Sequence, residues 1–198
     1  MDPDPFLRQQ KRAVRRSVIA SVLSMTPSER SAQEEVLAGL FPGLPGYAQA
    51  SSVLLYVKAF PEELDTRPFL HAAIASGKRL VCPRVDRAER RLRLFVVRSL
   101  SEDLEPGTLG ILEPRGHCEE VRPGEVDWVL VPGLAFDERA RRLGRGAGHY
   151  DRLLPRLRPG TPRHALAFDC QIVADLPVEP HDVPIDGVHT PSRAFLGA

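Results

Sequence analysis

Apolar residues near the start of the chain recur at helical spacing and predict a helix over residues 6–24. The stripe that they form consists of Leu7, Val14, Val18 and Val22. Lys11 falls inside this stripe and Arg15 lies at its edge. A lysine on an inward face is costly unless its stem reaches solvent or its ammonium meets an anion. Two interpretations follow: Lys11 extends along the surface to water, or Lys11 and Arg15 contact phosphate.

The next segment carries the signals of a helix start. Thr26 suits the N-cap, Pro27 the first helical position, and Glu29 completes a capping box. We expect this helix to run to about Leu40, before the break at residues 42–46.

The middle of the chain alternates between apolar runs and helical patterns. Residues 52–57 form a continuous apolar run, typical of a strand buried on both faces. A loop at 58–65, a helix over 66–77 and a strand at 79–82 follow, which together predict a βαβ unit. Further strands are expected at 92–97, at an edge of the sheet, and at 128–131, 164–168 and around 188, with a helix from about 149.

This order of elements predicts an α/β fold in one domain over residues 1–198. We expect a single open, mostly parallel and twisted sheet with helices on both faces, in a Rossmann-like arrangement. A chain of 198 residues is long enough to bury a sizeable core in such a domain.

Composition narrows the class of protein. Apolar residues make up 42% of the chain and charged residues 27%, and the net charge is +1, which argues against a general nucleic-acid binder. No apolar run approaches the length of a membrane span, and the N-terminus carries no signal core. Three widely spaced cysteines indicate neither a zinc site nor a disulfide framework, so we expect a cytoplasmic protein.

Glycine stands at every second position in the segment Arg-Leu-Gly-Arg-Gly-Ala-Gly-His-Tyr-Asp, residues 142–151. It lies between a predicted strand and a predicted helix start, where backbone N–H groups can bind phosphate. A flexible surface turn is the alternative. We expect this loop to meet the Glu62/Glu63 loop and the Pro83–Arg84 loop at one rim, because ligands of open α/β sheets bind at the carboxyl ends of the strands.

Several motifs, in this order along the chain, resemble the 5-formyltetrahydrofolate cyclo-ligase family, also called methenyltetrahydrofolate synthetases. They are Lys11-x-x-x-Arg15, Glu63-Leu-Asp-Thr66, Gly110-Ile-Leu-Glu-Pro114, Pro132-Gly-Leu-Ala-Phe-Asp137 and the glycine segment. The resemblance runs from about residue 8 to residue 190 and implies a fold similar to that of the NagB/RpiA/CoA-transferase-like proteins. It implies an ATP-dependent and Mg²⁺-dependent ligase that closes 5-formyltetrahydrofolate to 5,10-methenyltetrahydrofolate and releases ADP and phosphate. It also implies small-molecule substrates and no nucleic-acid or membrane partner, and we expect a monomer.

The resemblance carries roles onto individual residues. ATP is expected at Lys11, Arg15, Arg142, Leu143, Gly144, Arg145, Gly146, Ala147, Gly148, His149 and Tyr150. The folate is expected at Glu63, Arg145, Gly146, Ala147, Gly148 and His149. Mg²⁺ is expected at Asp151 and Asp182. Arg145 is the residue expected to stabilise the transferring phosphate, and we expect Arg145 and Asp151 to be exposed at the rim of the site.

Two residues of the glycine segment depart from the family pattern. Ala147 stands where some members have a lysine, and His149 stands where a tyrosine is usual. The loop before Glu63 is one residue longer, which leaves the register between Glu62 and Glu63 open. A non-catalytic nucleotide-binding or folate-binding module of the same fold is the alternative function. By themselves, Asp151 can be a first-turn helix carboxylate and Asp182 a turn residue.

Overall fold

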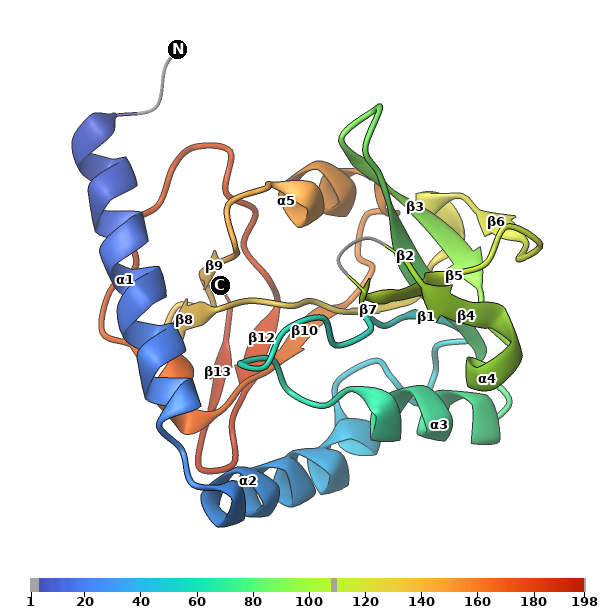
Figure 1. The fold of residues 1–198 in the computed structure, drawn as a ribbon, viewed down its shortest axis with the longest axis horizontal. Helices are drawn as coiled ribbons and strands as arrows, with labels where there is room; N and C mark the ends of the chain where they lie inside the picture. Colours follow the sequence, from blue (N-terminus) through green and yellow to red (C-terminus); the bar gives the residue numbers. More distant parts are fainter. Residues whose placement is uncertain (1–3, 108–109, 198) are drawn as a thin grey trace.

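The computed structural model describes residues 4–107 and 110–197, and its centre is an eight-stranded sheet of order β13-β12-β10-β7-β1-β2-β3-β6. The neighbours from β12 across to β2 are all parallel, whereas β13, β3 and β6 pair antiparallel at the two ends. Its strands are β1 (Ser52–Leu54), β2 (Arg79–Asp86), β3 (Arg91–Val96), β6 (Glu120–Val121), β7 (Trp128–Leu130), β10 (Arg163–Leu166), β12 (Gly187–His189) and β13 (Ala194–Leu196). The predicted open, mostly parallel sheet is therefore confirmed (Figure 1).

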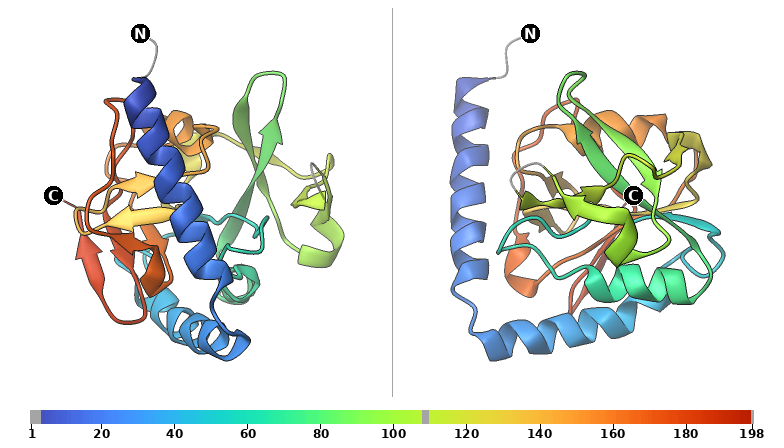
Figure 2. Two further views of the ribbon diagram at one scale, coloured as in Figure 1. Left: turned by 60° about the vertical axis from the view of Figure 1, so that its left-hand side comes forward. Right: turned by 45° about the vertical axis from the view of Figure 1, so that its right-hand side comes forward.

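Helices cover both faces of this sheet. They are α1 (Pro5–Leu23), α2 (Pro27–Leu40), α3 (Arg67–Ala75), α4 (Leu100–Asp103) and α5 (His149–Leu153), with short 3₁₀ turns η1 (Phe41–Gly43), η3 (Pro123–Glu125), η4 (Leu154–Arg156) and η5 (Asp169–Gln171). In Figures 1 and 2, α1 stands along one side of the molecule, α2 and α3 run below the sheet, and α5 lies above it. Among the described helices, none combines the length and the apolar character needed to cross a bilayer.

The central strands contribute to two separate cores. Val53 and Leu55 face the core under α1, α2 and α3, while Leu54 between them faces the core under α5. Trp128 on β7 joins the first core and Val129 the second. Side chains of a strand alternate between faces, so a strand that is apolar at every position fits only between two cores. The interpretation of residues 52–57 as a doubly buried run is correct.

The predicted helices at the start of the chain are confirmed. Val18 and Val22 of α1 are buried, and Lys11 on the same stripe is only 5% exposed. The Thr26 hydroxyl accepts a hydrogen bond from the Glu29 N–H, and the Glu29 carboxylate accepts one from the Thr26 N–H, so the capping box forms.

Strand lengths and the position of one strand differ from the sequence prediction. β1 leaves the sheet after Leu54, and β2 continues to Asp86 because it pairs with β3 over its whole outer half. β3 is not an edge strand, since Leu94 and Phe95 pair with the two-residue strand β6. The arginines of this strand were the reason for predicting an edge position. One of them, Arg93, instead forms an ion pair with Glu120 on β6.

Two small sheets have no counterpart in the sequence prediction. β11 (Ile172–Val173), β8 (Ala135–Asp137) and β9 (Arg142–Leu143) form one, and β4 (Leu104–Pro106) pairs with β5 (Leu112–Pro114) in the other. Strands of two or three residues are too short to show periodicity. α1 packs on β8 and η5, so the small β8 sheet fixes where α1 meets the body of the protein.

Candidate active site

A pocket of about 300 Å³ opens where β1 and β7 end. The chain passes from β1 to β2, its neighbour on one side, and later returns to β7, the neighbour of β1 on the other side. The pocket therefore lies at the point where the strand order reverses. Crevices of this kind are where open α/β sheets bind ligands. One wall follows β1 (Tyr56, Phe60), and the opposite wall follows β7 (Pro132, Gly133).

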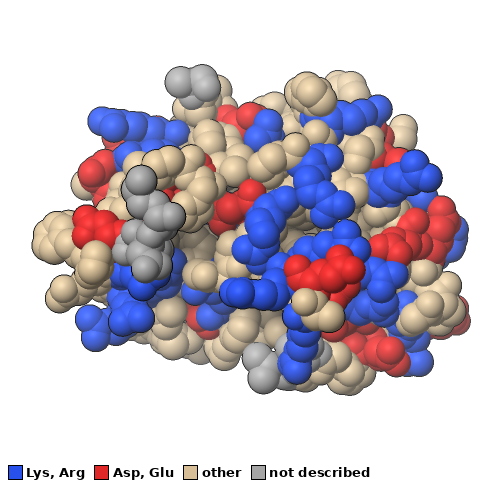
Figure 3. All heavy atoms as spheres, turned by 90° about the horizontal axis from the view of Figure 1, so that it is seen from above, with Lys and Arg blue, Asp and Glu red and all other residues tan. Residues whose placement is uncertain are grey.

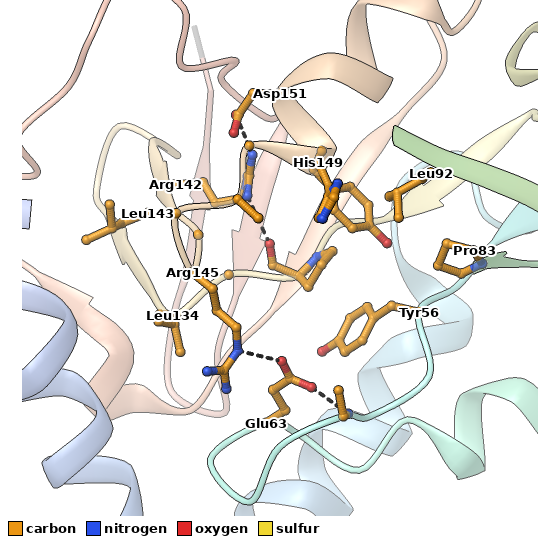
Figure 4. Close-up of a pocket in the computed structure, with 18 of the residues that line it drawn as sticks. Tyr56, Glu63, Pro83, Leu92, Leu134, Arg142, Leu143, Arg145, His149 and Asp151 are labelled. Carbon is orange, nitrogen blue, oxygen red and sulfur yellow. Dashed lines mark hydrogen bonds and ion pairs between the residues drawn. The ribbon is translucent and has the colours of Figure 1, made fainter. Parts of the chain in front are cut away.

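Every residue to which the family resemblance gave a role lines this one pocket. They are Lys11, Arg15, Glu63, residues 142–151 and Asp182. They come from α1, from the loop after β1, from the glycine segment and from the tail before β12. Figure 4 shows Glu63, Arg145, Arg142, His149 and Asp151 around the cavity, and Figure 3 shows that Lys and Arg side chains gather on the upper face of the molecule.

The glycine segment needs its glycines. Gly146 and Gly148 have φ angles of +105° and +65°, in the left-handed region that favours glycine. The Nε of Arg15 donates a hydrogen bond of 2.8 Å to the Gly144 carbonyl, which ties α1 to the start of the loop. Burial lowers the pKa of Arg15. The helix that follows, α5, has only five residues, so its dipole adds less to anion binding than the sequence suggested.

The buried Lys11 is explained by two carboxylates. Its ammonium lies 2.7 Å from Glu179 and 2.6 Å from Asp182, and its side chain is only 7% exposed. The Glu179 N–H also donates to the Asp182 carboxylate at 2.7 Å. Lys11 thus meets anions, as one interpretation of the sequence required, but these anions belong to the protein. Contact with phosphate stays a prediction.

Asp151 is less exposed than the sequence analysis expected. Its carboxylate accepts a 2.6 Å hydrogen bond from Arg142, and the two side chains are 19% and 4% exposed. The backbone N–H of Val183 lies 3.5 Å from the same carboxylate oxygen. The expectation of a rim carboxylate was wrong, because the segment leading to β12 and the guanidinium of Arg142 cover it. Its assignment to Mg²⁺ stays a prediction.

Arg145 bridges the glycine segment and the loop after β1. Its guanidinium lies 2.5 Å from Glu62 and 3.3 Å from Glu63, and 3.4 Å from the centre of the Phe60 ring. Its side chain is 33% exposed, as expected for a residue at the rim. The cation is therefore held between an aromatic face and two carboxylates.

Glu63 lines the pocket and Glu62 does not, which favours Glu63 in the open register of the longer loop. One carboxylate oxygen of Glu63 accepts hydrogen bonds from the N–H groups of Ala59 at 2.7 Å and Phe60 at 3.3 Å, and the other faces Arg145. Glu62 is buried beneath it, with 7% of its surface exposed.

Two buried tyrosines and a histidine form the wall nearest β2 and β3. Burial raises the pKa of both Tyr56 and Tyr150, so both phenols remain protonated donors. The Tyr150 hydroxyl is buried without a hydrogen-bond partner among the described residues. Burial, and secondarily the charge of Arg152, lower the pKa of His149, which favours a neutral imidazole.

Sequence reasoning missed several lining residues, among them Tyr56, Phe60, Glu179 and His181. Tyr56 lies in the predicted strand 52–57 and Phe60 in the predicted loop after it, so their position near the carboxyl end of that strand was an available signal. Glu179 and His181 lie in a proline-rich tail without periodicity, and nothing local marked them. Glu179, His181 and Asp182 offer ligand atoms within 4.8 Å of one another.

Comparison with known proteins gives a consistent result. The sequence profile of the 5-formyltetrahydrofolate cyclo-ligase family matches residues 7–191. The chain is 33% identical to the mitochondrial 5-formyltetrahydrofolate cyclo-ligase of Arabidopsis thaliana over 93% of this chain and 75% of that protein. It is 31% identical to the 5-formyltetrahydrofolate cyclo-ligase of Escherichia coli K12 over 96% and 99% of the two chains. The NMR structure of 5,10-methenyltetrahydrofolate synthetase from Aquifex aeolicus superposes with a TM-score of 0.82 at 31% identity, covering 94% of this chain and 92% of that one.

Proposed function

The chain belongs to the 5-formyltetrahydrofolate cyclo-ligase family, and we propose that its pocket cyclises 5-formyltetrahydrofolate to 5,10-methenyltetrahydrofolate at the expense of ATP. The observation that carries this proposal is the meeting of four distant segments at one crevice. Two cations of α1, the glycine loop, the Glu63 loop and the acidic tail all line the same cavity. The enzyme works as a monomer in this proposal, since one chain supplies all of these segments.

The chemistry consists of two displacements. The formyl oxygen attacks the γ-phosphorus of ATP, the bond from that phosphorus to the bridging oxygen breaks, and ADP leaves. N10 of the folate then attacks the carbon of the resulting imidate phosphate and loses its proton to water. The carbon–oxygen bond breaks, inorganic phosphate leaves, and the methenyl bridge remains. Such steps depend mainly on positioning and on stabilisation of negative charge.

The cationic side chains that line the pocket support a role in binding phosphate. Lys11 and Arg15 of α1 and Arg145 of the loop face one cavity with the backbone of residues 144–148. Arg145 acts on the transferring phosphoryl group in this proposal, because it is the most exposed of the arginines that the structure pairs across the cavity. Its present partners, Glu62 and Glu63, must release it or share it when phosphate enters.

The donor set near Lys11 fits a magnesium ion. Mg²⁺ prefers oxygen ligands and is usually held by one or two carboxylates together with substrate phosphates. Asp182 and Glu179 supply such carboxylates beside the ammonium of Lys11. Asp151 supplies a third carboxylate, which accepts a hydrogen bond from the N–H of Val183, the residue after Asp182. These three residues would hold the ion. Mg²⁺ would neutralise charge on the phosphates.

In this proposal the pterin lies against the wall of the pocket that follows β1. Glu63 presents one carboxylate oxygen toward Arg145 while the other is fixed by two backbone N–H groups, so the group is oriented before the substrate arrives. A carboxylate can accept paired hydrogen bonds from the amino and ring N–H groups of a pterin. Tyr56, Pro83 and Leu92 supply apolar surface beside it (Figure 4).

The experiment that tests the function is an absorbance assay. Protein, ATP, Mg²⁺ and 5-formyltetrahydrofolate should develop the near-ultraviolet absorbance of the methenyl product, and omitting ATP should abolish it. Binding of nucleotide or folate by calorimetry without any product at saturating substrates would show that the chain is a non-catalytic binding module. Neither binding nor product would overturn both functions.

A further inference from the structure

Arg152 contacts the glycine segment through its guanidinium. It belongs to α5 and does not line the cavity, although every residue from 142 to 151 does. Its Nη2 donates to the Ala147 carbonyl at 2.8 Å and to the Arg90 carbonyl at 2.6 Å, and its Nε donates to Arg90 at 3.1 Å. The Nη2 also lies 3.3 Å from His149 Nδ1. One side chain thus joins the glycine segment to the turn between β2 and β3.

The contact with Ala147 fixes the orientation of a peptide group. In a trans peptide, the carbonyl of one residue and the N–H of the next point in opposite directions. With the Ala147 carbonyl turned toward Arg152, the N–H of Gly148 is turned away from Arg152, and both residues of this peptide line the cavity. Within residues 4–107 and 110–197, no acceptor is hydrogen-bonded to that N–H.

Gly148 lies in close contact with the guanidinium of Arg152. A Cβ added at Gly148 would stand 2.9 Å from the Arg152 Nη1, and the φ of +65° already disfavours a side chain there. A side chain at this position would therefore have to displace the end of the Arg152 guanidinium, which contacts Ala147.

Arg90, which Arg152 also contacts, belongs to a hairpin whose strands line the pocket. Arg90 is at the tip of the hairpin formed by β2 and β3, and its φ is +50°, one of two positive values among the described residues other than glycine. Pro83 and Val85 on β2 and Leu92 on β3 line the pocket. Arg152 therefore links the β2–β3 hairpin, which forms one wall of the pocket, to the glycine segment, which forms another.

We propose that Arg152 is a positioning residue that sets the Ala147–Gly148 peptide so that the Gly148 N–H is presented to an anionic group of the ligand. The proposal rests on the proposed function only in naming that anion as a phosphate of the nucleotide. It attributes the effect to geometry rather than to charge. A guanidinium has a planar fork of five N–H donors and can hold two carbonyls at once, whereas a lysine ammonium is a point charge that cannot reproduce the fork.

The test compares R152M and R152K with R156M in hydrogen exchange and nucleotide binding. Arg156 is an exposed arginine one turn further along the chain, so R156M is a control for the loss of one positive charge. We expect R152M and R152K both to speed amide exchange in residues 143–149. Both should weaken binding of Mg²⁺–ADP by about tenfold, the size expected for one hydrogen bond to a charged group. R156M should change neither, and KM for ATP should rise more than kcat falls.

A second variant keeps Arg152 and removes its partner. Replacing residues 87–90 by Asn-Gly closes the β2–β3 hairpin with a two-residue turn and deletes the Arg90 carbonyl. It should loosen the glycine segment as R152M does, and combining the two changes should add little further effect. If R152M fails to fold, R152K and the hairpin variant carry the test.

Normal exchange of residues 143–149 in R152K, or additive effects of the two changes, would overturn the proposal. The exchange and ADP measurements need no turnover. A wild-type protein that binds ADP in an Arg152-dependent way but forms no methenyl product would contradict the proposed function and leave the role of Arg152 standing.

Discussion

Replacing Lys11 by methionine tests the ion triad that joins α1 to the tail. Methionine is similar in length and suits the apolar stripe, so the change removes the charge with little loss of packing. It leaves Glu179 and Asp182, which are 14% and 20% exposed, without their cation. We expect K11M to lower stability and to weaken ATP binding.

The magnitude follows from the burial of the three groups. Breaking a fully buried ion pair by removing one partner costs about 3–5 kcal/mol. The carboxylates here retain access to water, so we expect about 2–3 kcal/mol, which corresponds to a fall in Tm of about 5–10 °C for a chain of this size. Chemical denaturation and calorimetry of K11M measure this loss. R16M, on an exposed position of the same helix, is the matched control.

A compensated variant makes the reasoning refutable. The triple change K11M/E179Q/D182N removes all three charges, so no carboxylate is left unpaired, and stability should return to within about 1 kcal/mol of the wild type. A K11M protein as stable as R16M would refute the reasoning. So would a triple variant that is as unstable as K11M.

Three further outcomes are expected. R145K keeps a cation but loses the fork that faces the cavity, so kcat should fall about 100-fold while Tm changes by no more than a few degrees; equal losses would indicate a structural role. D151N leaves the guanidinium of Arg142, 4% exposed, with a neutral partner, so it should lower stability by about 1–3 kcal/mol in chemical denaturation, and an unchanged midpoint would contradict this. Burial lowers the pKa of His189 to about 4 and also lowers that of His164, whose ring nitrogen lies 3.2 Å away. The fold therefore favours neutral imidazoles, and stability present above about pH 6.5 should be lost as the pH falls toward 4. After discounting for the partial exposure of His189, we expect a loss of about 1–2 kcal/mol, which should be smaller in H189N because His164 keeps its own lowered pKa.

The sequence predicted the large elements because each carries a repeated local signal. The stripe that includes Val18 and Val22 and the Thr26 capping box fixed α1 and α2 almost to the residue. The unbroken apolar run at 52–57 indicated a central strand, and its neighbours supplied the βαβ unit. The strands of the β8 sheet were missed because two or three residues cannot show a period, and β3 was misplaced because its partner β6 is equally short.

The members of the candidate site were easier to predict than their contacts. Lys11 could be singled out because a cation on an apolar stripe requires an anion, but its partners lie about 170 residues away in a tail with no pattern. The same is true of Asp151: the glycine segment marked it, whereas its pairing with Arg142 depends on the turn of β9 back toward α5. Long-range contacts of charged side chains are set by the fold and leave no mark on local sequence.

The salt bridges from Lys11 to the tail have a consequence for the synthesis of the protein. They join residues 168 and 171 positions apart, so α1 must wait for the segment around residue 180 to be synthesised before the buried ammonium of Lys11 is neutralised. Contacts of such long range form late in folding. A nascent chain that ends before residue 179 carries the glycine loop and Arg145 but lacks the partners of Lys11. The pocket is therefore completed only after Glu179 and Asp182 have been synthesised, and fragments that stop before them should bind nucleotide poorly even where most of the sheet is formed.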